Sequence, residues 1–209
     1  MSESRDVHVV LDLDATLILS IEKEVPKKKA TLPPNSPRRQ RMPDDRRLKG
    51  NLANREEEWF DIDEMGLRVH LRPHLVRFLV ELFQNATTVS IWSAGSTEYV
   101  RAIAKNLQRL TKRKFTIVWS LPDCADDGTG YPVKPIGKII ESPEGQRIGM
   151  RIDNTVLIDD LQDNFDLSPN NVYQISPYAE RDPYDYYLLE ALRMVMQIRG
   201  KSRPVRKAA

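Results

Sequence analysis

Side chains that can bind a metal ion or a phosphate group recur in this sequence directly after short apolar runs. They are carboxylates, hydroxyls and one lysine in a segment rich in glycine and proline. Clustered carboxylates repel one another unless a cation neutralises them, and oxygen ligands favour a hard ion such as Mg²⁺. Hydroxyls and an ammonium can stabilise the oxygens of a phosphate. The set comprises Asp12, Asp14, Thr16, Ser93, Lys134, Asp159 and Asp160.

Each role in a phosphoryl transfer assisted by Mg²⁺ has a candidate in this set. One carboxylate can attack phosphorus, while a second, two residues further along, protonates the leaving oxygen and then activates water. A Mg²⁺ ion held by two or three protein oxygens keeps positions open for a phosphate oxygen and water. An isolated DxD or DD pair usually marks a turn or a surface. The order DxDxT, Ser, Lys and Asp-Asp along one chain therefore carries the prediction.

Strands and helices alternate along the chain, and this predicts the fold that must position these residues. Such alternation favours an α/β fold, a doubly wound parallel sheet with helices on both faces. Ligands bind at the carboxyl ends of the strands in such sheets, so we expect the set to converge there. The sequence predicts strands over residues 7–13, 67–71, 87–92, 115–120, 155–159 and 172–176, and helices over 74–83, 97–110 and 185–198.

Two basic segments stand apart from this pattern. Residues 23–49 hold ten Lys/Arg against three Asp/Glu, and residues 199–209 hold five Lys/Arg and no acid, whereas the whole chain has a net charge of +2. The remainder is therefore acidic. We expect one domain over 1–198 with a flexible basic insertion after the first strand, at 22–58, and a basic tail at 199–209. Such segments either are solvated or attract nucleic acid, and both interpretations stay open here.

Composition excludes several classes of protein. No apolar run approaches the about 18 residues that span a membrane, so we predict no membrane partner. The start lacks the features of a secretion signal, and the single cysteine, Cys124, allows no intramolecular disulfide. We expect an intracellular protein, nuclear or cytoplasmic, whose oligomeric state is left open. Cys124 has no paired histidine signature, so a nucleophilic thiol is not expected.

Four motifs of the chain resemble those of the haloacid dehalogenase superfamily. They read DLDATL, IWSAGS, VKPIGK and VLIDDL. With the segment LRPHLVRFLVEL, they are most similar to RNA polymerase II C-terminal-domain phosphatases and NLI-interacting-factor-like small phosphatases. The likeness covers roughly residues 6–198 without the insertion. Compact members occur in large DNA viruses, and a chain of this length is compatible with one.

The resemblance implies roles for the motif residues. Asp12 would accept the phosphoryl group, and Asp14 would be the general acid and base. Thr16, Ser93 and Lys134 would bind phosphate, with Lys134 preferred over Lys138 because it matches the third motif.

The remaining roles concern the catalytic loop and the metal. Thr16 would support the loop beside the phosphate. The implied Mg²⁺ ligands are Asp12, Asp14 through its backbone carbonyl, and the pair Asp159 and Asp160, between which the direct ligand stays open.

Three functions remain compatible with these residues. The first is a Mg²⁺-dependent phosphatase that acts on phosphoserine or phosphothreonine in a protein, such as a polymerase C-terminal domain, through an aspartyl-phosphate. The second is a nucleic acid end phosphatase, suggested by the basic segments. The third is a non-catalytic phosphoprotein-binding module, against which the intact acids and lysine argue.

Overall fold

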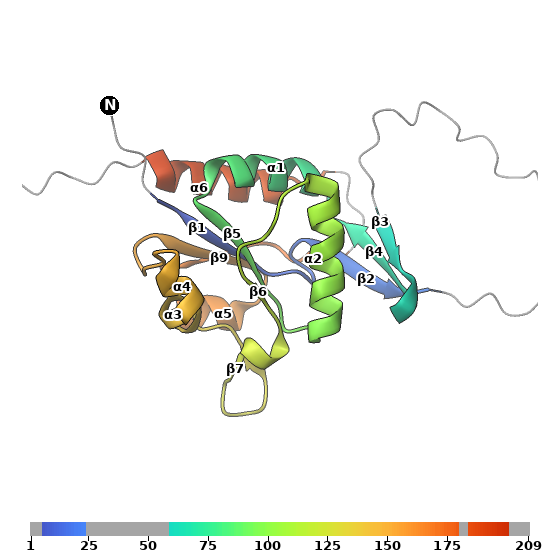
Figure 1. The fold of residues 1–209 in the computed structure, drawn as a ribbon, viewed down its shortest axis with the longest axis horizontal. Coiled ribbons are helices and arrows are strands. Elements are labelled where there is room, and N and C mark those ends of the chain that lie inside the picture. Colours follow the sequence, from blue (N-terminus) through green and yellow to red (C-terminus); the bar gives the residue numbers. More distant parts are fainter. Residues whose placement is uncertain (1–5, 24–58, 180–183, 201–209) are drawn as a thin grey trace, which may run out of the picture.

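A five-stranded parallel sheet forms the centre of the protein in the computed structural model, which describes residues 6–23, 59–179 and 184–200. The strand order is β10–β9–β1–β5–β6, and every neighbouring pair is parallel (Figure 1). The predicted parallel α/β fold is confirmed. Its strands are β1 (His8–Leu11), β5 (Thr88–Trp92), β6 (Val118–Trp119), β9 (Thr155–Asp159) and β10 (Val172–Gln174).

The central strand, β1, fixes the edge at which the predicted residues meet. Its four residues are all buried, as expected for a strand covered on both faces. Leu11 at its end lies opposite Ile91 of β5 and Ile158 of β9. The ladder continues for one more bond, because the backbone N–H of Asp12 donates to the carbonyl of Ile158 at 3.0 Å. The residues that follow these three strands therefore emerge at one edge.

Helices cover both faces of the sheet, as predicted. Val9 and Leu11 of β1 belong to a core shared with α1, α2 and α6, whereas Val10 faces a second core that includes residues of α3 and, at its margin, α5. Helix α4 packs beside α3 (Figure 1). The helices are α1 (Leu75–Asn85), α2 (Thr97–Thr111), α3 (Ile136–Glu141), α4 (Pro143–Arg147), α5 (Gln162–Leu167) and α6 (Tyr187–Gly200).

A second, antiparallel sheet lies beside the first and was not predicted. It consists of β2 (Ile18–Glu22), β4 (Leu67–Leu71) and β3 (Trp59–Ile62) in the order β2–β4–β3. The predicted strand over 67–71 is confirmed, but its partners are β2 and β3 and not strands of the parallel sheet. Cross-strand partners depend on residues distant in sequence, so the local alternation of LRVHL could not reveal them.

The predicted insertion over 22–58 falls largely outside the described residues, as does the tail from residue 201. Its first two residues are described and lie at the end of β2. Glu22 ends β2, and the backbone N–H of Lys23 donates to the carbonyl of Gly66 at 2.8 Å. In the sequence, β2 precedes residues 24–58 and β3 follows them. In the sheet, these two strands lie on opposite sides of β4.

Short elements connect β6 to α3 and deliver the lysine of the third motif. They are the 3₁₀ turn η3 (Leu121–Asp123) and the hairpin of β7 (Ala125–Asp126) with β8 (Pro132–Val133). A further 3₁₀ turn, η2 (Asp63–Met65), lies between β3 and β4. Lys134 directly follows β8.

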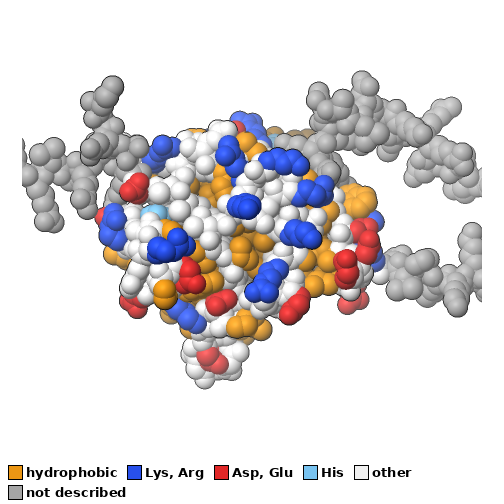
Figure 2. Space-filling model, in the orientation of Figure 1, with side chains coloured by type: hydrophobic (Ala, Val, Ile, Leu, Met, Phe, Trp, Pro, Cys, Tyr) orange, Lys and Arg blue, Asp and Glu red, His pale blue; other side chains and the backbone are white. Residues whose placement is uncertain are grey.

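Exposed charge is not distributed evenly over the described surface. Figure 2 shows Lys and Arg side chains gathered over α2 and the turn that follows it. The exposed basic residues of α2 and of the turn that follows it are Arg101, Lys105, Arg109, Lys112, Arg113 and Lys114.

Among the residues described, no helix is long and apolar enough to cross a membrane.

Candidate active site

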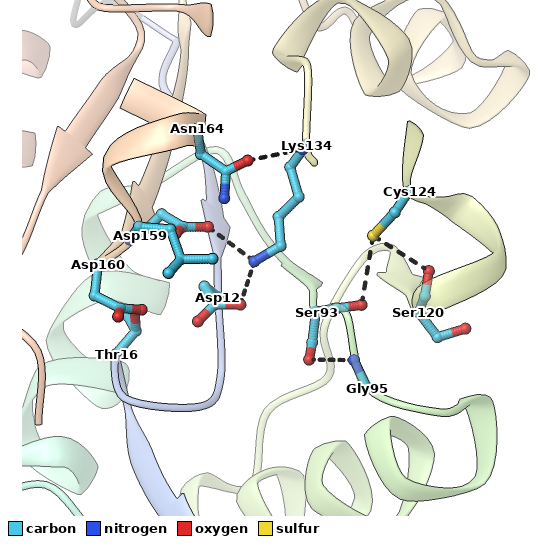
Figure 3. Close-up of polar contacts among 11 residues, drawn as sticks. Asp12, Thr16, Ser93, Gly95, Ser120, Cys124, Lys134, Asp159, Asp160 and Asn164 are labelled. Atoms are coloured by element: carbon cyan, nitrogen blue, oxygen red, sulfur yellow. Dashed lines mark hydrogen bonds and ion pairs between the residues drawn. The ribbon is translucent and has the colours of Figure 1, made fainter. Parts of the chain in front are cut away.

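The carboxyl edge of the parallel sheet brings together residues from all four motifs (Figure 3). Asp12 follows β1 directly and Ser93 follows β5. Asp159 ends β9, with Asp160 next to it. Lys134 reaches the same place from the loop after β8, so residues more than 140 positions apart in the sequence share one site.

Lys134 is the cation at the centre of this site. Only 1% of its side chain is exposed, and its Nζ donates to Asp159 Oδ2 at 2.8 Å and also to Asp12 Oδ1. Its backbone N–H donates to the side-chain carbonyl of Asn164 at 2.8 Å, which anchors the chain at this position. Burial alone lowers the pKa of Lys134, but the two carboxylates outweigh this effect and raise it above its usual value. Lys134 is therefore protonated and contributes one positive charge to the site.

Three carboxylates lie close together here, and two of them, Asp12 and Asp159, contact the ammonium of Lys134. Asp12, Asp159 and Asp160 each place an oxygen within 4.8 Å of the others. Burial, together with the charges of Asp159 and Asp160, raises the pKa of Asp12 to about 7 despite the opposing effect of Lys134. Burial likewise raises the pKa of Asp160. The cluster carries more negative charge than one lysine can balance, so its oxygens fit a divalent hard cation such as Mg²⁺.

Asp14 lies outside this group of three carboxylates. Its Oδ1 accepts a hydrogen bond from the hydroxyl of Tyr99, in the first turn of α2. Burial raises the pKa of Asp14, and the bond from Tyr99 opposes that rise. The side chain is thus held by a neutral donor, and the proposed contribution of its backbone carbonyl to metal binding stays a prediction.

The two predicted hydroxyls have different partners. Thr16 donates its hydroxyl hydrogen to Asp160 Oδ1 at 3.0 Å, so it orients a candidate metal ligand. Ser93 instead accepts a bond from the backbone N–H of Gly95 at 3.1 Å. Because a serine hydroxyl can donate and accept at once, Ser93 retains its own hydrogen for a phosphate oxygen.

Arg72 holds the loop that carries both aspartates. Its guanidinium donates to the carbonyl of Thr16 at 2.9 Å, to Ser176 at 2.7 Å and to the carboxylate of Asp185 at 2.8 Å. Within the same loop Ala15 adopts a left-handed backbone with a φ of 58°, which is costly for a residue other than glycine. A buried arginine with an acceptor at each of its three nitrogens can hold such a conformation in place.

Sequence reasoning missed three side chains that organise the site. Arg72 appeared only within the segment LRPHLVRFLVEL that contributes to the family resemblance, whereas Tyr99 and Asn164 were not singled out. Tyr99 follows Ser93 by six residues, and Asn164 follows Asp159 by five. Their proximity to motif residues was the available signal, but only the packing of α2 and α5 shows which way they point.

Cys124 lies beside the site, where its Sγ is 3.9 Å from the carbonyl oxygens of both Ser93 and Ser120 (Figure 3). Burial raises the pKa of its thiol, so the thiolate needed for nucleophilic attack is disfavoured. This agrees with the expectation that Cys124 is not a nucleophile.

Comparison with known proteins identifies the family. The family model of NLI interacting factor-like phosphatases matches residues 7–206. The chain belongs to this family. The resemblance drawn from the four motifs is therefore confirmed.

Individual relatives agree with this family. The chain is 31% identical over 116 residues to ubiquitin-like domain-containing CTD phosphatase 1 of Xenopus tropicalis, a match that covers 53% of this chain and 35% of the relative. The human protein of the same name is 29% identical over 123 residues, covering 56% and 37%. The chain thus spans little more than a third of the length of these curated relatives.

Solved structures support the fold. Fission yeast RNA polymerase II CTD phosphatase Fcp1, in a variant bound to beryllium fluoride, aligns with a TM-score of 0.51 over 93% of this chain and 53% of that chain. Sequence identity in this alignment is 16%, so the likeness concerns the fold alone.

Proposed function

We propose that this protein is a Mg²⁺-dependent phosphatase that removes phosphate from phosphoserine or phosphothreonine in a protein through an aspartyl-phosphate intermediate. The observation that carries this proposal is the buried contact of Lys134 with both Asp12 and Asp159 at the carboxyl edge of the sheet. This contact places the ammonium of Lys134 directly beside the carboxylate of Asp12. The site thereby holds a nucleophile and a cation for the phosphate oxygens next to each other.

Asp12 is the proposed nucleophile. One of its oxygens attacks phosphorus, and the bond from phosphorus to the seryl oxygen breaks. Asp14 gives its proton to that departing oxygen, which leaves as a serine hydroxyl. Asp14 then takes a proton from the water that attacks the aspartyl-phosphate, and this step releases inorganic phosphate and restores both side chains. The raised pKa of Asp14 supports the first of its two roles, because it favours the protonated form.

The other side chains bind the phosphate and the metal. Lys134 and the free hydrogen of Ser93 stabilise the equatorial oxygens of the phosphoryl group. Asp12, Asp159 and Asp160 would hold Mg²⁺, which would neutralise further negative charge on the phosphate.

A protein substrate is proposed from the names of the relatives, which are CTD phosphatases. The alternative of a nucleic acid end phosphatase rests on the basic segments 23–49 and 199–209, most of which lie outside the described residues. The alternative of a non-catalytic binding module requires an inactive site, but Asp12, Asp14 and Lys134 are all present.

Hydrolysis of p-nitrophenyl phosphate by the purified protein tests the chemistry. We expect phosphate release that requires Mg²⁺ and is lost in Asp12→Asn, with unchanged circular dichroism showing that the variant is folded. No release by the wild type, with Mg²⁺ binding confirmed by calorimetry, would favour the binding module. Metal-dependent release that survives in Asp12→Asn would exclude the covalent mechanism.

Salt dependence separates the two classes of substrate. Binding to many backbone phosphates releases condensed counterions, and this release is less favourable at high salt. Such binding therefore weakens steeply as the salt concentration rises, whereas binding of a short phosphopeptide responds less. We expect kcat/KM to be higher for a phosphoserine peptide than for an oligonucleotide with a 5′ or 3′ phosphate, and to change little between 50 and 200 mM salt. A preference for the oligonucleotide with a steep salt response would replace the protein substrate by nucleic acid.

A further inference from the structure

Tyr99 connects two elements of the site that sequence motifs do not link. Its hydroxyl oxygen lies 2.5 Å from Ser20 Oγ of β2, and it also contacts Asp14 Oδ1. The tyrosine lies in the first turn of α2, three residues after the helix cap Ser96. One phenolic oxygen therefore ties the antiparallel sheet and α2 to the catalytic loop.

The direction of these hydrogen bonds follows from the number of hydrogens. Tyr99 has one hydroxyl hydrogen and donates it to the carboxylate of Asp14. Ser20 must then donate its own hydrogen to the oxygen of Tyr99. Burial and the charge of Asp14 raise the pKa of Tyr99 above its usual value, so the phenol stays protonated and remains a donor. The resulting order, Ser20 to Tyr99 to Asp14, polarises the last bond in the chain.

We propose that Tyr99 is the positioning residue of Asp14: by occupying Oδ1, it fixes the carboxyl group so that Oδ2 faces the leaving oxygen of the substrate. This inference rests on the proposed function, because it concerns the acid and base of that reaction. A proton donor that rotates freely loses much of its effect, since proton transfer requires a defined short distance to the leaving oxygen.

Gly95 supports this assignment independently. A Cβ atom built at this position would lie 2.6 Å from Cδ1 and 3.2 Å from Cε1 of the Tyr99 ring. Real side chains do not approach so closely, so any residue larger than glycine would displace the ring. Gly95 belongs to the segment that begins with Ser93, and it donates its backbone N–H to the Ser93 hydroxyl. The loop after β5 is thus shaped to hold both the phosphate-binding hydroxyl and the ring of Tyr99.

The kinetic test uses two substrates that differ in their need for an acid. Nitrophenolate leaves without protonation, whereas the alkoxide of serine must receive a proton. The ratio kcat/KM reports only the steps up to formation of the aspartyl-phosphate, in which Asp14 acts as the acid. In Tyr99→Phe we expect kcat/KM to fall at least about tenfold on a phosphoserine peptide and about twofold on p-nitrophenyl phosphate, because a positioned acid contributes about 10²–10⁴ in total. Gly95→Ala, which keeps the hydroxyl but moves the ring, should show the same dependence on the leaving group.

Two further variants identify the route of the effect. Tyr173→Phe removes the hydroxyl of a half-buried tyrosine in β10 and serves as the control, so it should leave kcat/KM unchanged on both substrates. In an Asp14→Asn background, Tyr99→Phe should have no additional effect on kcat/KM for the phosphoserine peptide, because the acid that Tyr99 positions is already lost. An equal loss of kcat/KM on the two substrates would overturn the inference and make Tyr99 a structural or substrate-binding residue.

A stability cycle tests the contact without any activity. The midpoint temperatures of unfolding of Tyr99→Phe, Asp14→Ala and the double variant should be non-additive, with the double variant losing less than the two single losses combined, because each substitution alone removes the contact. Additive losses would overturn the inference. Absence of turnover by the wild type on both substrates would instead count against the proposed function, and the cycle would still decide whether Tyr99 holds Asp14.

Discussion

Asp12 and Asp14 lie two residues apart in one loop, yet their side chains face partners of different charge. Asp12 contacts the ammonium of Lys134, among two further carboxylates, and Asp14 contacts the neutral phenol of Tyr99. Both carboxyl groups have a pKa raised chiefly by burial. Only at Asp12, however, do neighbouring carboxylates add to the rise. Adding a cation to the cluster therefore restores the charge of Asp12 far more than that of Asp14.

This difference separates the roles of two chemically identical groups. A nucleophile must be ionised when the phosphate arrives, and a general acid must keep its proton until the leaving oxygen departs. One site can combine both roles because the environments of its two carboxyl groups affect their pKa values differently. In this protein the separation arises from different elements, because Lys134 comes from the loop after β8 and Tyr99 comes from α2.

The largest expected effect distinguishes the two aspartates directly. With p-nitrophenyl phosphate, Asp12→Asn should lose turnover by at least about 10⁴-fold, because the nucleophile is gone. Asp14→Asn should still form the aspartyl-phosphate, since nitrophenolate needs no acid, but it should release phosphate slowly because no base activates water. Rapid-quench kinetics should show a burst of nitrophenolate only in Asp14→Asn. A burst in Asp12→Asn would exchange the two roles.

Removal of the Lys134 ammonium should lower both the activity and the stability of the protein. Lys134→Met leaves Asp12 and Asp159 buried without their ammonium, so we expect kcat/KM to fall about 10²–10³-fold and the free energy of unfolding to fall by about 3 kcal/mol. Urea unfolding should show a smaller loss of stability at saturating Mg²⁺, which supplies positive charge to the same oxygens.

Lys138→Met is the matched control for this substitution. Lys138 is exposed, and its Nζ donates to the carbonyl of Cys124 at 2.9 Å. We expect little change in either quantity. A larger loss of activity in Lys138→Met than in Lys134→Met would reassign the phosphate-binding lysine.

The metal requirement should depend on Asp160 and, more weakly, on Thr16. Asp160→Ala should raise the Mg²⁺ concentration for half-maximal activity by about 10–100-fold, and Thr16→Val, which removes the bond that orients Asp160, should raise it less. Turnover at saturating Mg²⁺ should recover more fully in Thr16→Val. An unchanged Mg²⁺ requirement in Asp160→Ala would leave Asp159 as the metal ligand of the pair.

Mg²⁺ binding should release a proton near neutral pH. The pKa of Asp12 is about 7 without a metal ion, and a divalent ion favours the ionised form, so it lowers that pKa. Affinity should therefore increase as pH rises through this value and level off above it. Calorimetry in buffers of different ionisation enthalpy measures the release, which should disappear in Asp12→Asn. A release that persists there would assign the proton to another group, such as Asp160.

The convergence of the four motifs could be predicted because parallel strands impose it. The residues after β1, β5 and β9 must emerge at one edge, and short apolar runs were enough to locate those strands. The partner of Asp14 could not be predicted in the same way. It depends on the rotation of α2, on the space beside Gly95 and on β2, whose pairing with β4 joins residues separated by the long segment between Glu22 and Trp59.

The smallest expected effect concerns the outer end of the hydrogen-bond chain. Ser20→Ala removes the donor to Tyr99 but leaves the phenol against Asp14, so kcat on a phosphoserine peptide should fall only about two- to threefold, in line with the loss of one neutral hydrogen bond of about 0.5 kcal/mol. Ser20→Thr keeps a hydroxyl and should retain more activity than Ser20→Ala. A loss as large as that of Tyr99→Phe would mean that Ser20, and not the ring packing beside Gly95, determines where the phenol lies. The position of the Tyr99 phenol beside Asp14 would then be determined mainly by β2. The charged groups around Asp12 are instead positioned by the parallel sheet and the loop after β8.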